Sequence, residues 1–245
     1  KLSSRKLRGV MSHGMLASPR ELGLWNEHEG IMEIGAADAI DVRVGAKLSD
    51  YLDLDDYLLE VENKSLTHRP DCFGVIGFAR EVAAIMGQSA DIPDWFNNLD
   101  GKLTVDKPAV KPTVAIADSS LCTRYECVAL DDIDSGCQLS DEMRSLLGRV
   151  GVNSISAPVD ITNYLMLDSG QPLHAFDLDK IIEVSPTGRP DIIVRAASKG
   201  ETLELLDGRT IALSPADIVV AAGDAASSVP IALAGAMGGM ATEIT

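Results

Sequence analysis

Cysteine, long apolar runs and positive charge are all scarce in this sequence. The four cysteines, Cys72, Cys122, Cys127 and Cys137, are scattered along 245 residues. Cys122 and Cys127 have the wrong spacing for a zinc knuckle, and no second pair follows them. We therefore interpret the cysteines as reduced thiols with a core-packing role in a cytoplasmic protein, and we predict no metal site.

The missing apolar runs and the acidic charge exclude further classes of protein. No run approaches the roughly 20 apolar residues of a membrane helix, and the start, KLSSRKLRGV, lacks the apolar region of a signal peptide. We expect no membrane association. With 21 Lys and Arg against 37 Asp and Glu, the net charge is −16, which argues against a surface that mainly binds phosphates. Because the chain has no starting Met and ends at MATEIT, we expect a fragment of a longer protein.

Local signals predict several elements in the first part of the chain. Ser18 is followed by a Pro at the first helical position and by an acid, which predicts a helix that Gly23 ends. Residues 57–61 read as a short strand, and the apolar period over 73–87 predicts a helix that Gly87 ends. The polar stretch 97–113 contains two prolines, and we place a domain boundary near residue 105.

Beyond that boundary the pattern mixes helix and strand. Ser140 caps a predicted helix that runs to about Val150. Asp207 and Gly208 supply the turn of a predicted hairpin. Strands are expected over 113–118, 191–197, 217–224 and 230–239, the last two buried. The expected fold class is mixed, α+β or α/β, with a small helix-rich N-terminal domain and a larger mixed-sheet domain.

The first candidate site surrounds His174, one of only four histidines. Asp160 can cap a short helix over 161–170, with Thr162 and Asn163 in its first turn. Pro172 stiffens the approach to His174, whose imidazole can orient water or accept a proton near neutral pH. The alternative is a core histidine with a satisfied hydrogen bond, and the spacing leaves both interpretations open.

Two other segments are weaker candidates. The Gly-rich run 233–240, LAGAMGGM, allows close approach to a ligand, but it matches neither phosphate-binding fingerprint and can equally be a tight turn after a strand. In the segment THRPDC, His68 and Arg69 could be catalytic. Alternatively, the segment is a loop fixed by its proline and by Asp71, which would cap the next helix. No Ser-His-Asp, HExxH or Cys nucleophile pattern is present.

Five stretches together resemble the beta subunit of bacterial phenylalanyl-tRNA synthetase. They occur in the family's order over most of the chain: KLRGVMSHGMLASPRELGL, LTHRPDCFGVIGFAREVAAI, VDITNYLMLDSGQPLHAFDLDKI, ELLDGRT and ALAGAMGG. The resemblance implies three domains. Residues 1–20 would be the tail of an OB-fold that binds tRNA, residues 21–105 a small helix-rich domain, and residues 106–245 an editing domain truncated at its C-terminus.

The family's editing domain hydrolyses tyrosine wrongly attached to the phenylalanine tRNA. The resemblance implies that His174, Asn163 and Thr162 are catalytic, with His174 and Asn163 positioning the ester and the attacking water. It further implies substrate-binding positions in the proline turn and the Gly-rich run, where Gly235 and its neighbours would line the wall against the aminoacyl group. These positions are Pro172, Ala175, Ala234, Gly235 and Ala236.

The same resemblance implies partners. The full enzyme would be a heterotetramer of two alpha and two beta subunits that attaches Phe to tRNA(Phe) with ATP and Mg²⁺, and its synthetic site would lie in the alpha subunit. This chain itself would hold no cofactor and would meet tyrosine, or Tyr-tRNA, at the editing site. Two departures bear on selectivity for Tyr. A phenol-binding Glu of the family lies in a strand beyond Thr245, and residues 153–158, NSISAP, replace a stretch that usually begins with Arg.

Two other functions stay open. The chain could be a scaffold that positions tRNA and the partner subunit without chemistry, which its acidic charge favours. It could also be an unrelated small-molecule-binding α/β domain, which the ordered run of motifs argues against.

Overall fold

The computed structural model describes residues 3–34, 43–97, 110–134, 136–137 and 139–244. These residues form two compact units, each assembled from two stretches of chain. The first unit contains residues 1–88 and 135–171, and the second contains residues 89–134 and 172–245. The domain boundary expected near residue 105 lies outside the described residues.

The first unit is mainly helical. It begins with an antiparallel hairpin of two short strands, β1 (Arg5–Leu7) and β2 (Val10–Ser12). Its helices are α1 (Pro19–Leu22), α2 (Leu48–Tyr51), η1 (Lys64–Leu66), η2 (Pro70–Phe73), α3 (Val75–Met86), α5 (Asp141–Arg149) and α6 (Ala157–Ser169).

Side-chain caps explain where two of these helices begin. Ser18 and Glu21 form a complete capping box around Pro19 at the start of α1, and Gly23 ends the helix in the left-handed conformation. Ser140 accepts a hydrogen bond from the Met143 amide at the start of α5. Both predicted helix starts are confirmed, as is the end of α1.

Helix α5 packs against Leu24 and Trp25, which form a small core with Leu52. The guanidinium of Arg144 lies 4.6 Å from the centre of the Trp25 ring and also pairs with Glu27. A Cβ built on Gly148 would lie only 2.3 Å from the Leu24 carbonyl oxygen, so α5 meets this loop through bare backbone.

Three predictions in the first unit need correction, the third of them in α6. Residues 57–61 form no strand: they pair with no neighbour among the described residues, and Leu58 is 71% exposed. Helix α3 ends at Gly87 as predicted, but Asp71 does not cap it. The cap position is Gly74, and the Asp71 carboxylate accepts hydrogen bonds from Arg69 instead.

Helix α6 also begins earlier than predicted, at Ala157, and Gly170 ends it in the left-handed conformation as expected. Asp160 is therefore inside the helix and does not cap it. Its buried carboxylate accepts hydrogen bonds from the Ser154 hydroxyl at 2.5 Å and the Ile155 amide at 2.8 Å, which pins the chain that leads into the helix.

The second unit is built on a five-stranded sheet of order β3-β4-β7-β8-β9. Strands β3 and β4 are parallel, and the other neighbours are antiparallel. Its elements are α4 (Asp94–Asn97), β3 (Val114–Ile116), α7 (Leu178–Val184), β4 (Ile192–Ala196), β5 (Thr202–Glu204), β6 (Thr210–Ala212), β7 (Ile218–Gly223), β8 (Ser228–Leu233), β9 (Met237–Gly238) and η3 (Met240–Thr242).

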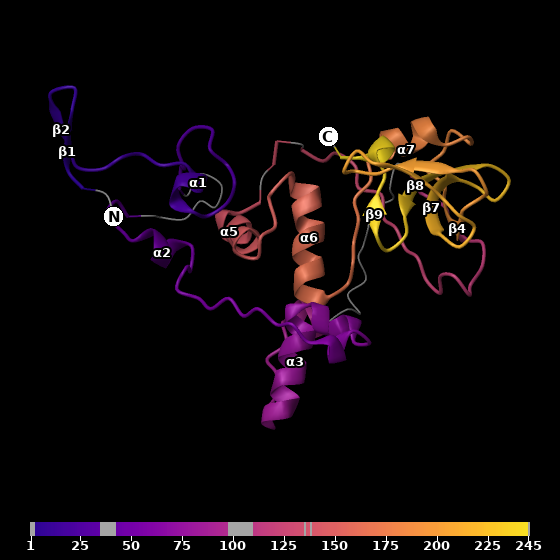
Figure 1. Cartoon of the computed structure of the whole chain (residues 1–245), viewed down its shortest axis with the longest axis horizontal. Coiled ribbons are helices and arrows are strands. Elements are labelled where there is room, and N and C mark those ends of the chain that lie inside the picture. The colour runs from indigo at the N-terminus through magenta and orange to yellow at the C-terminus, as the bar shows by residue number, and fades with distance from the viewer. Residues whose placement is uncertain (1–2, 35–42, 98–109, 135, 138, 245) are drawn as a thin grey trace. The chain divides into compact units, whose positions relative to one another are not determined.

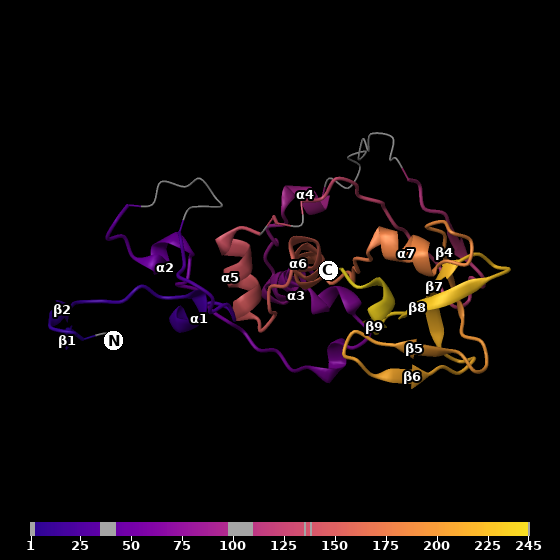
Figure 2. The ribbon, with the colours of Figure 1, turned by 90° about the horizontal axis from the view of Figure 1, so that it is seen from above.

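Both faces of this sheet are covered, which explains the continuous apolar run of β7. Val220 and Ala222 contribute to a core with Ile181 of α7, whereas Val219 packs with Leu203 of the β5–β6 hairpin. Figure 2 shows α7 and this hairpin on opposite sides of β7 and β8. The predicted hairpin is confirmed, with Gly208 at φ +80° in its turn.

The run expected as one strand over 230–239 is instead a hairpin. Strand β8 ends at Leu233, residues 234–236 turn, and β9 returns beside β8. Gly235 has φ +70° at the turn, a conformation that glycine adopts without strain. The register of β7 and β8 shifts between Val220 and Ala221, next to Pro230, which cannot donate a ladder hydrogen bond. The mixed fold class is confirmed.

Candidate functional site

His174 lies in an irregular segment that leads into α7. Asp177 ends this segment as the helix cap: its carboxylate accepts hydrogen bonds from the amides of Asp179 and Lys180. The Asp177 amide in turn donates to the Thr242 carbonyl oxygen at 3.0 Å. The segment is therefore held at its C-terminal end within the second unit.

The ring of His174 sits directly over the backbone of β9. A Cβ built on Gly238 would lie 2.5 Å from both Cε1 and Nε2 of His174, so the ring occupies the space that a side chain would need. Phe176 meets the ring edge to face, with 4.5 Å between ring centres. Because Phe176 packs against the core under α7, two fixed groups set the plane of the imidazole.

The electrostatics of His174 favour the neutral imidazole. Partial desolvation by the surrounding protein lowers the pKa of His174 below its ordinary value of 6.5. The side chain is nevertheless exposed on one side, and neither ring nitrogen forms a hydrogen bond with any described residue. The alternative of a core histidine with a satisfied hydrogen bond is therefore wrong. A neutral, solvent-facing imidazole can accept a hydrogen bond from water or a substrate.

The Gly-rich turn belongs to the same hairpin as Gly238. Ala234 is half-buried and packs against the core, whereas Gly235 and Ala236 are exposed. A Cβ built on Gly235 would meet nothing within 4 Å, so this side of the turn is open. Within the second unit, the structure brings His174 together with the Gly-rich run, because Gly238 follows the turn by two residues.

The remaining predicted residues fall in two places. Thr162 and Asn163 lie on α6, in the first unit. The Thr162 hydroxyl donates to the Val159 carbonyl oxygen at 2.7 Å, and the half-buried Asn163 amide has no hydrogen-bond partner among the described residues. Pro172 and Ala175 belong to the second unit, on the segment around His174, one exposed and the other half-buried. A shared site of these residues with His174 stays a prediction.

The sequence did not single out Phe176 and Leu206 as neighbours of His174, and it included Gly238 only as part of the Gly-rich run. The Leu206 amide donates to the Gly238 carbonyl oxygen at 3.1 Å, and Phe176 packs on the imidazole. Leu206 Cδ1 would lie 3.1 Å from a Cβ built on Gly238, so Leu206 and the imidazole both pack against the side of Gly238 where a side chain would be. The pattern His-x-Phe before a helix was the only local signal for Phe176.

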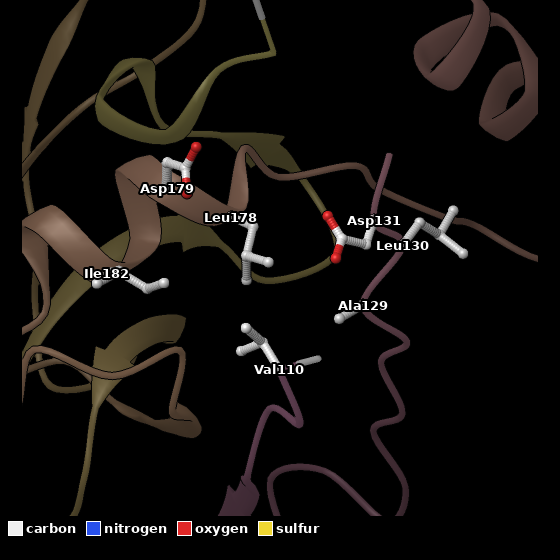
Figure 3. A pocket seen from close by; sticks show the side chains of 7 residues that line it. All are labelled: Val110, Ala129, Leu130, Asp131, Leu178, Asp179 and Ile182. Atoms are coloured by element: carbon white, nitrogen blue, oxygen red, sulfur yellow. The ribbon is translucent and has the colours of Figure 1, made fainter. Parts of the chain in front are cut away.

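A hollow of about 120 Å³ in the second unit is separate from these residues. Figure 3 shows apolar side chains around it, with the carboxylates of Asp131 and Asp179 at its edge. Ligand pockets are usually about 300–1,000 Å³, so we assign it no role. The residues that line it are Val110, Ala129, Leu130, Asp131, Leu178, Asp179 and Ile182.

Searches for other kinds of site cover the described residues. Nowhere in them do three His, Cys, Asp or Glu side chains gather as metal ligands would. Within the same residues, no helix has the length and apolar character needed to cross a membrane. None of the four cysteines, all of them described, forms a disulfide.

Comparison with known proteins identifies the family. The B3/4 domain model matches residues 121–245, a little over half of the chain, and the chain belongs to this family. Over its full length the chain is also 41% identical to the phenylalanine–tRNA ligase beta subunit of Bordetella pertussis. The beta subunits of Thiobacillus denitrificans and Carboxydothermus hydrogenoformans are 39% and 38% identical over 98% and 99% of the chain. The resemblance predicted from the motifs is confirmed.

The chain spans only part of these relatives. It covers 28% of the length of each of the three beta subunits. Their names describe whole proteins, so the activity of the whole enzyme comes to this chain only as a proposal.

Proposed function

We propose that this chain is the editing part of a phenylalanine–tRNA ligase beta subunit, which hydrolyses tyrosine wrongly attached to tRNA(Phe). The observation that carries the proposal is His174: a neutral imidazole, fixed over Gly238 and facing solvent beside an open glycine turn. The full-length similarity to beta subunits supports the choice of enzyme.

The proposed reaction is hydrolysis of an aminoacyl ester. A water molecule adds to the ester carbonyl carbon, the bond to the tRNA ribose oxygen breaks, and that oxygen takes up the proton that water loses. His174 accepts a hydrogen bond from the attacking water and so orients it. In this proposal the Asn163 amide donates to the ester carbonyl oxygen, where negative charge develops, and Thr162 lies one residue away on α6.

The need for such a site follows from the chemistry of the two amino acids. Tyr differs from Phe by one hydroxyl, and an apolar pocket rejects an added hydroxyl by only on the order of a hundredfold. A second site that hydrogen-bonds the phenol can supply the rest, because Phe would leave its polar groups unpaired. Pro172, Ala175 and the turn from Ala234 to Ala236 would bind the aminoacyl group against bare backbone.

The full enzyme would contain parts that this chain does not. We infer a complex of two alpha and two beta subunits in the cytoplasm that charges tRNA(Phe) with Phe, using ATP and Mg²⁺. By the family resemblance, ATP and Mg²⁺ would bind elsewhere in that complex, at the synthetic site of the alpha subunit. The alpha subunit and tRNA(Phe) would be the partners of this chain.

A second candidate function is a scaffold that carries out no chemistry. The net charge of −16 favours it, because contacts to tRNA phosphates come from Lys and Arg. Under this candidate, the chain would position the partner subunit, and His174 would have no catalytic role.

A His174→Ala variant of the full two-subunit enzyme separates the two functions. Under the editing proposal, hydrolysis of Tyr-tRNA(Phe) falls at least about a hundredfold, the usual scale for loss of a group that assists proton transfer. Charging with Phe and subunit assembly stay near their unmutated levels. Unchanged hydrolysis of Tyr-tRNA(Phe) would contradict the proposed role of His174, and absence of any such hydrolysis in the unmutated enzyme would favour the scaffold.

A further inference from the structure

The segment THRPDC and the C-terminal end of α6 meet in the first unit without any side chain between them. A Cβ built on Gly74 would lie 2.1 Å from the amide nitrogen of Gly170, and one on Gly170 would lie 2.8 Å from the Pro70 carbonyl oxygen. Figure 1 shows this end of α6 against η2 and the start of α3. Contact between two backbones leaves no flexible group to absorb a shift, so the position of the helix end is closely defined.

A third glycine holds η2 against α3 in the same way. A Cβ built on Gly77 would lie 2.0 Å from the carbonyl oxygen of Asp71, so the first turn of α3 packs on the backbone of η2. We call these backbone contacts the glycine junction: Gly74 meets Gly170, and Gly77 and Gly170 meet the backbone of Pro70 and Asp71.

Arg69 ties the glycine junction together through its guanidinium. Its Nε and Nη2 donate to the two carboxylate oxygens of Asp71 at 2.9 and 2.8 Å, and its Nη1 donates to Glu81 of α3 at 2.9 Å. The bidentate pair fixes the orientation of the carboxylate as well as its distance. Because these groups are partly exposed, the ion pairs contribute little to global stability. Their effect is geometric.

Helix α6 connects the glycine junction, at its C-terminal end, to Thr162 and Asn163 near its N-terminal end. Asn163 lies seven residues before Gly170, about 10 Å along the axis at 1.5 Å per residue. The other end of the helix is held by the buried Asp160. With that end held, a displacement at Gly170 would tilt α6 about Asp160 and so turn Thr162 and Asn163, which follow Asp160 by two and three residues.

We propose that the glycine junction, with Arg69 as its clamp, is a positioning device that sets the placement of Thr162 and Asn163 for the reaction. The inference rests on the proposed editing function and gives the THRPDC segment a role. Arg69, Gly74 and Gly170 touch neither substrate nor reacting atoms, and they act through α6.

The test compares two glycines that both end a helix in the left-handed conformation. Gly170 follows α6 at φ +76°, and Gly87 follows α3 at φ +67°, but a Cβ on Gly87 would meet nothing within 4 Å. Gly170→Ala and Gly87→Ala therefore share the backbone strain and differ in the junction contact. We expect Gly170→Ala to lower kcat for Tyr-tRNA(Phe) hydrolysis by about tenfold to a hundredfold more than Gly87→Ala, with KM unchanged.

A milder variant guards against loss of folding. Arg69→Gln breaks the partly exposed ion pair of Arg69 with Asp71 at the glycine junction. Its control is Arg124→Gln, which breaks an exposed ion pair of the same spacing, Arg124 with Glu126, away from the junction. Arg69→Gln is expected to lower kcat by roughly threefold or more without changing KM or Tm much, and Arg124→Gln should leave kcat unchanged.

A second readout does not depend on activity. The NMR signal of the Thr162 methyl group in the full enzyme should shift in Gly170→Ala and Arg69→Gln, and stay in place in Gly87→Ala and Arg124→Gln. The positioning role would be overturned if Gly170→Ala had the same kcat as Gly87→Ala and Arg69→Gln the same kcat as Arg124→Gln. It would also be overturned if the Thr162 signal stayed in place in all four variants. If the unmutated enzyme hydrolyses no Tyr-tRNA but the Thr162 signal moves as expected, the editing proposal fails while the junction still sets the placement of α6.

Discussion

At the scale of single residues, van der Waals contacts, and not hydrogen bonds, set the orientation of the His174 ring. The described residues provide no hydrogen bond to its ring, yet Gly238 beneath it and Phe176 at its edge leave the imidazole little freedom. The ring is thus held without using the hydrogen-bonding capacity of either nitrogen. The position of Gly238 matters because any side chain there would occupy the space of the ring.

Gly238→Ala tests this arrangement. The added Cβ would lie 2.5 Å from the imidazole, so the ring must move, whereas the backbone at Gly238 is outside the left-handed region and gains no strain. We expect Tyr-tRNA(Phe) hydrolysis to fall by about tenfold to a hundredfold, since misplacement by about 1 Å has effects of this size. Single-turnover deacylation measures it. Gly14→Ala, which meets open space, is the control, and equal rates for the two variants would contradict the account.

The protonation of His174 gives a second prediction at this scale. Desolvation lowers its pKa below 6.5 in the folded protein. Between pH 6.5 and the pKa of the folded protein, the unfolded chain binds more protons than the folded one, so stability decreases as the pH falls through this window.

The same pKa shift predicts how activity depends on pH. Hydrolysis that needs the neutral imidazole should stay constant from pH 7.5 to 6.5 and fall only at lower pH. An NMR titration of the His174 ring, assigned with His174→Asn, should give the same midpoint. A midpoint above 6.5 would be inconsistent with the desolvated ring.

At the scale of elements, capping chemistry decides where several helices begin and end. Ser140 caps α5 through a hydrogen bond from the Met143 amide at 3.3 Å. Ser156 holds the same position at α6 but makes no such bond, and its buried hydroxyl has no partner among the described residues. Two residues of one type at equivalent positions thus differ in a single interaction.

Substitution by Ala should therefore change the free energy of unfolding differently at Ser140 and at Ser156. Ser140→Ala should lower the free energy of unfolding by about 1 kcal/mol, the usual effect of losing a side-chain cap. Ser156→Ala should be neutral or stabilising, because it removes a buried hydroxyl without a partner. Urea denaturation of the two variants measures both values. A cost of Ser156→Ala as large as that of Ser140→Ala would mean that the α6 serine caps its helix after all.

Elements with local signals could be predicted from the sequence, and elements that depend on distant partners could not. The box of Ser18 and Glu21 and the turn at Gly208 contain their own signals within a few residues. Asp160 looked like a cap because its partners, Ser154 and Ile155, lie outside the helix pattern. The strand expected over 57–61 had apolar residues, but no described residue pairs with it. The turn at Gly235 lies inside a continuous apolar run, and the sequence of that run does not show whether it forms one strand or two.

At the scale of the whole molecule, the residues that the sequence predicts for one site are divided between the two units. Thr162 and Asn163 belong to the first, and His174 and the Gly-rich turn belong to the second. Spacing along the chain suggested a loop around His174, but only the fold placed Gly238 and Leu206 beside its ring. The roles of the individual residues came from the family resemblance, which the 38–41% identity to beta subunits supports.

The most direct test of editing is the selectivity of the unmutated two-subunit enzyme. Tyr-tRNA(Phe) and Phe-tRNA(Phe), each labelled on the amino acid, are incubated with the enzyme, and release of each amino acid is followed over time without ATP. The account predicts rapid release of Tyr while Phe remains attached. Equal stability of the two esters would contradict it and would leave the chain as a scaffold.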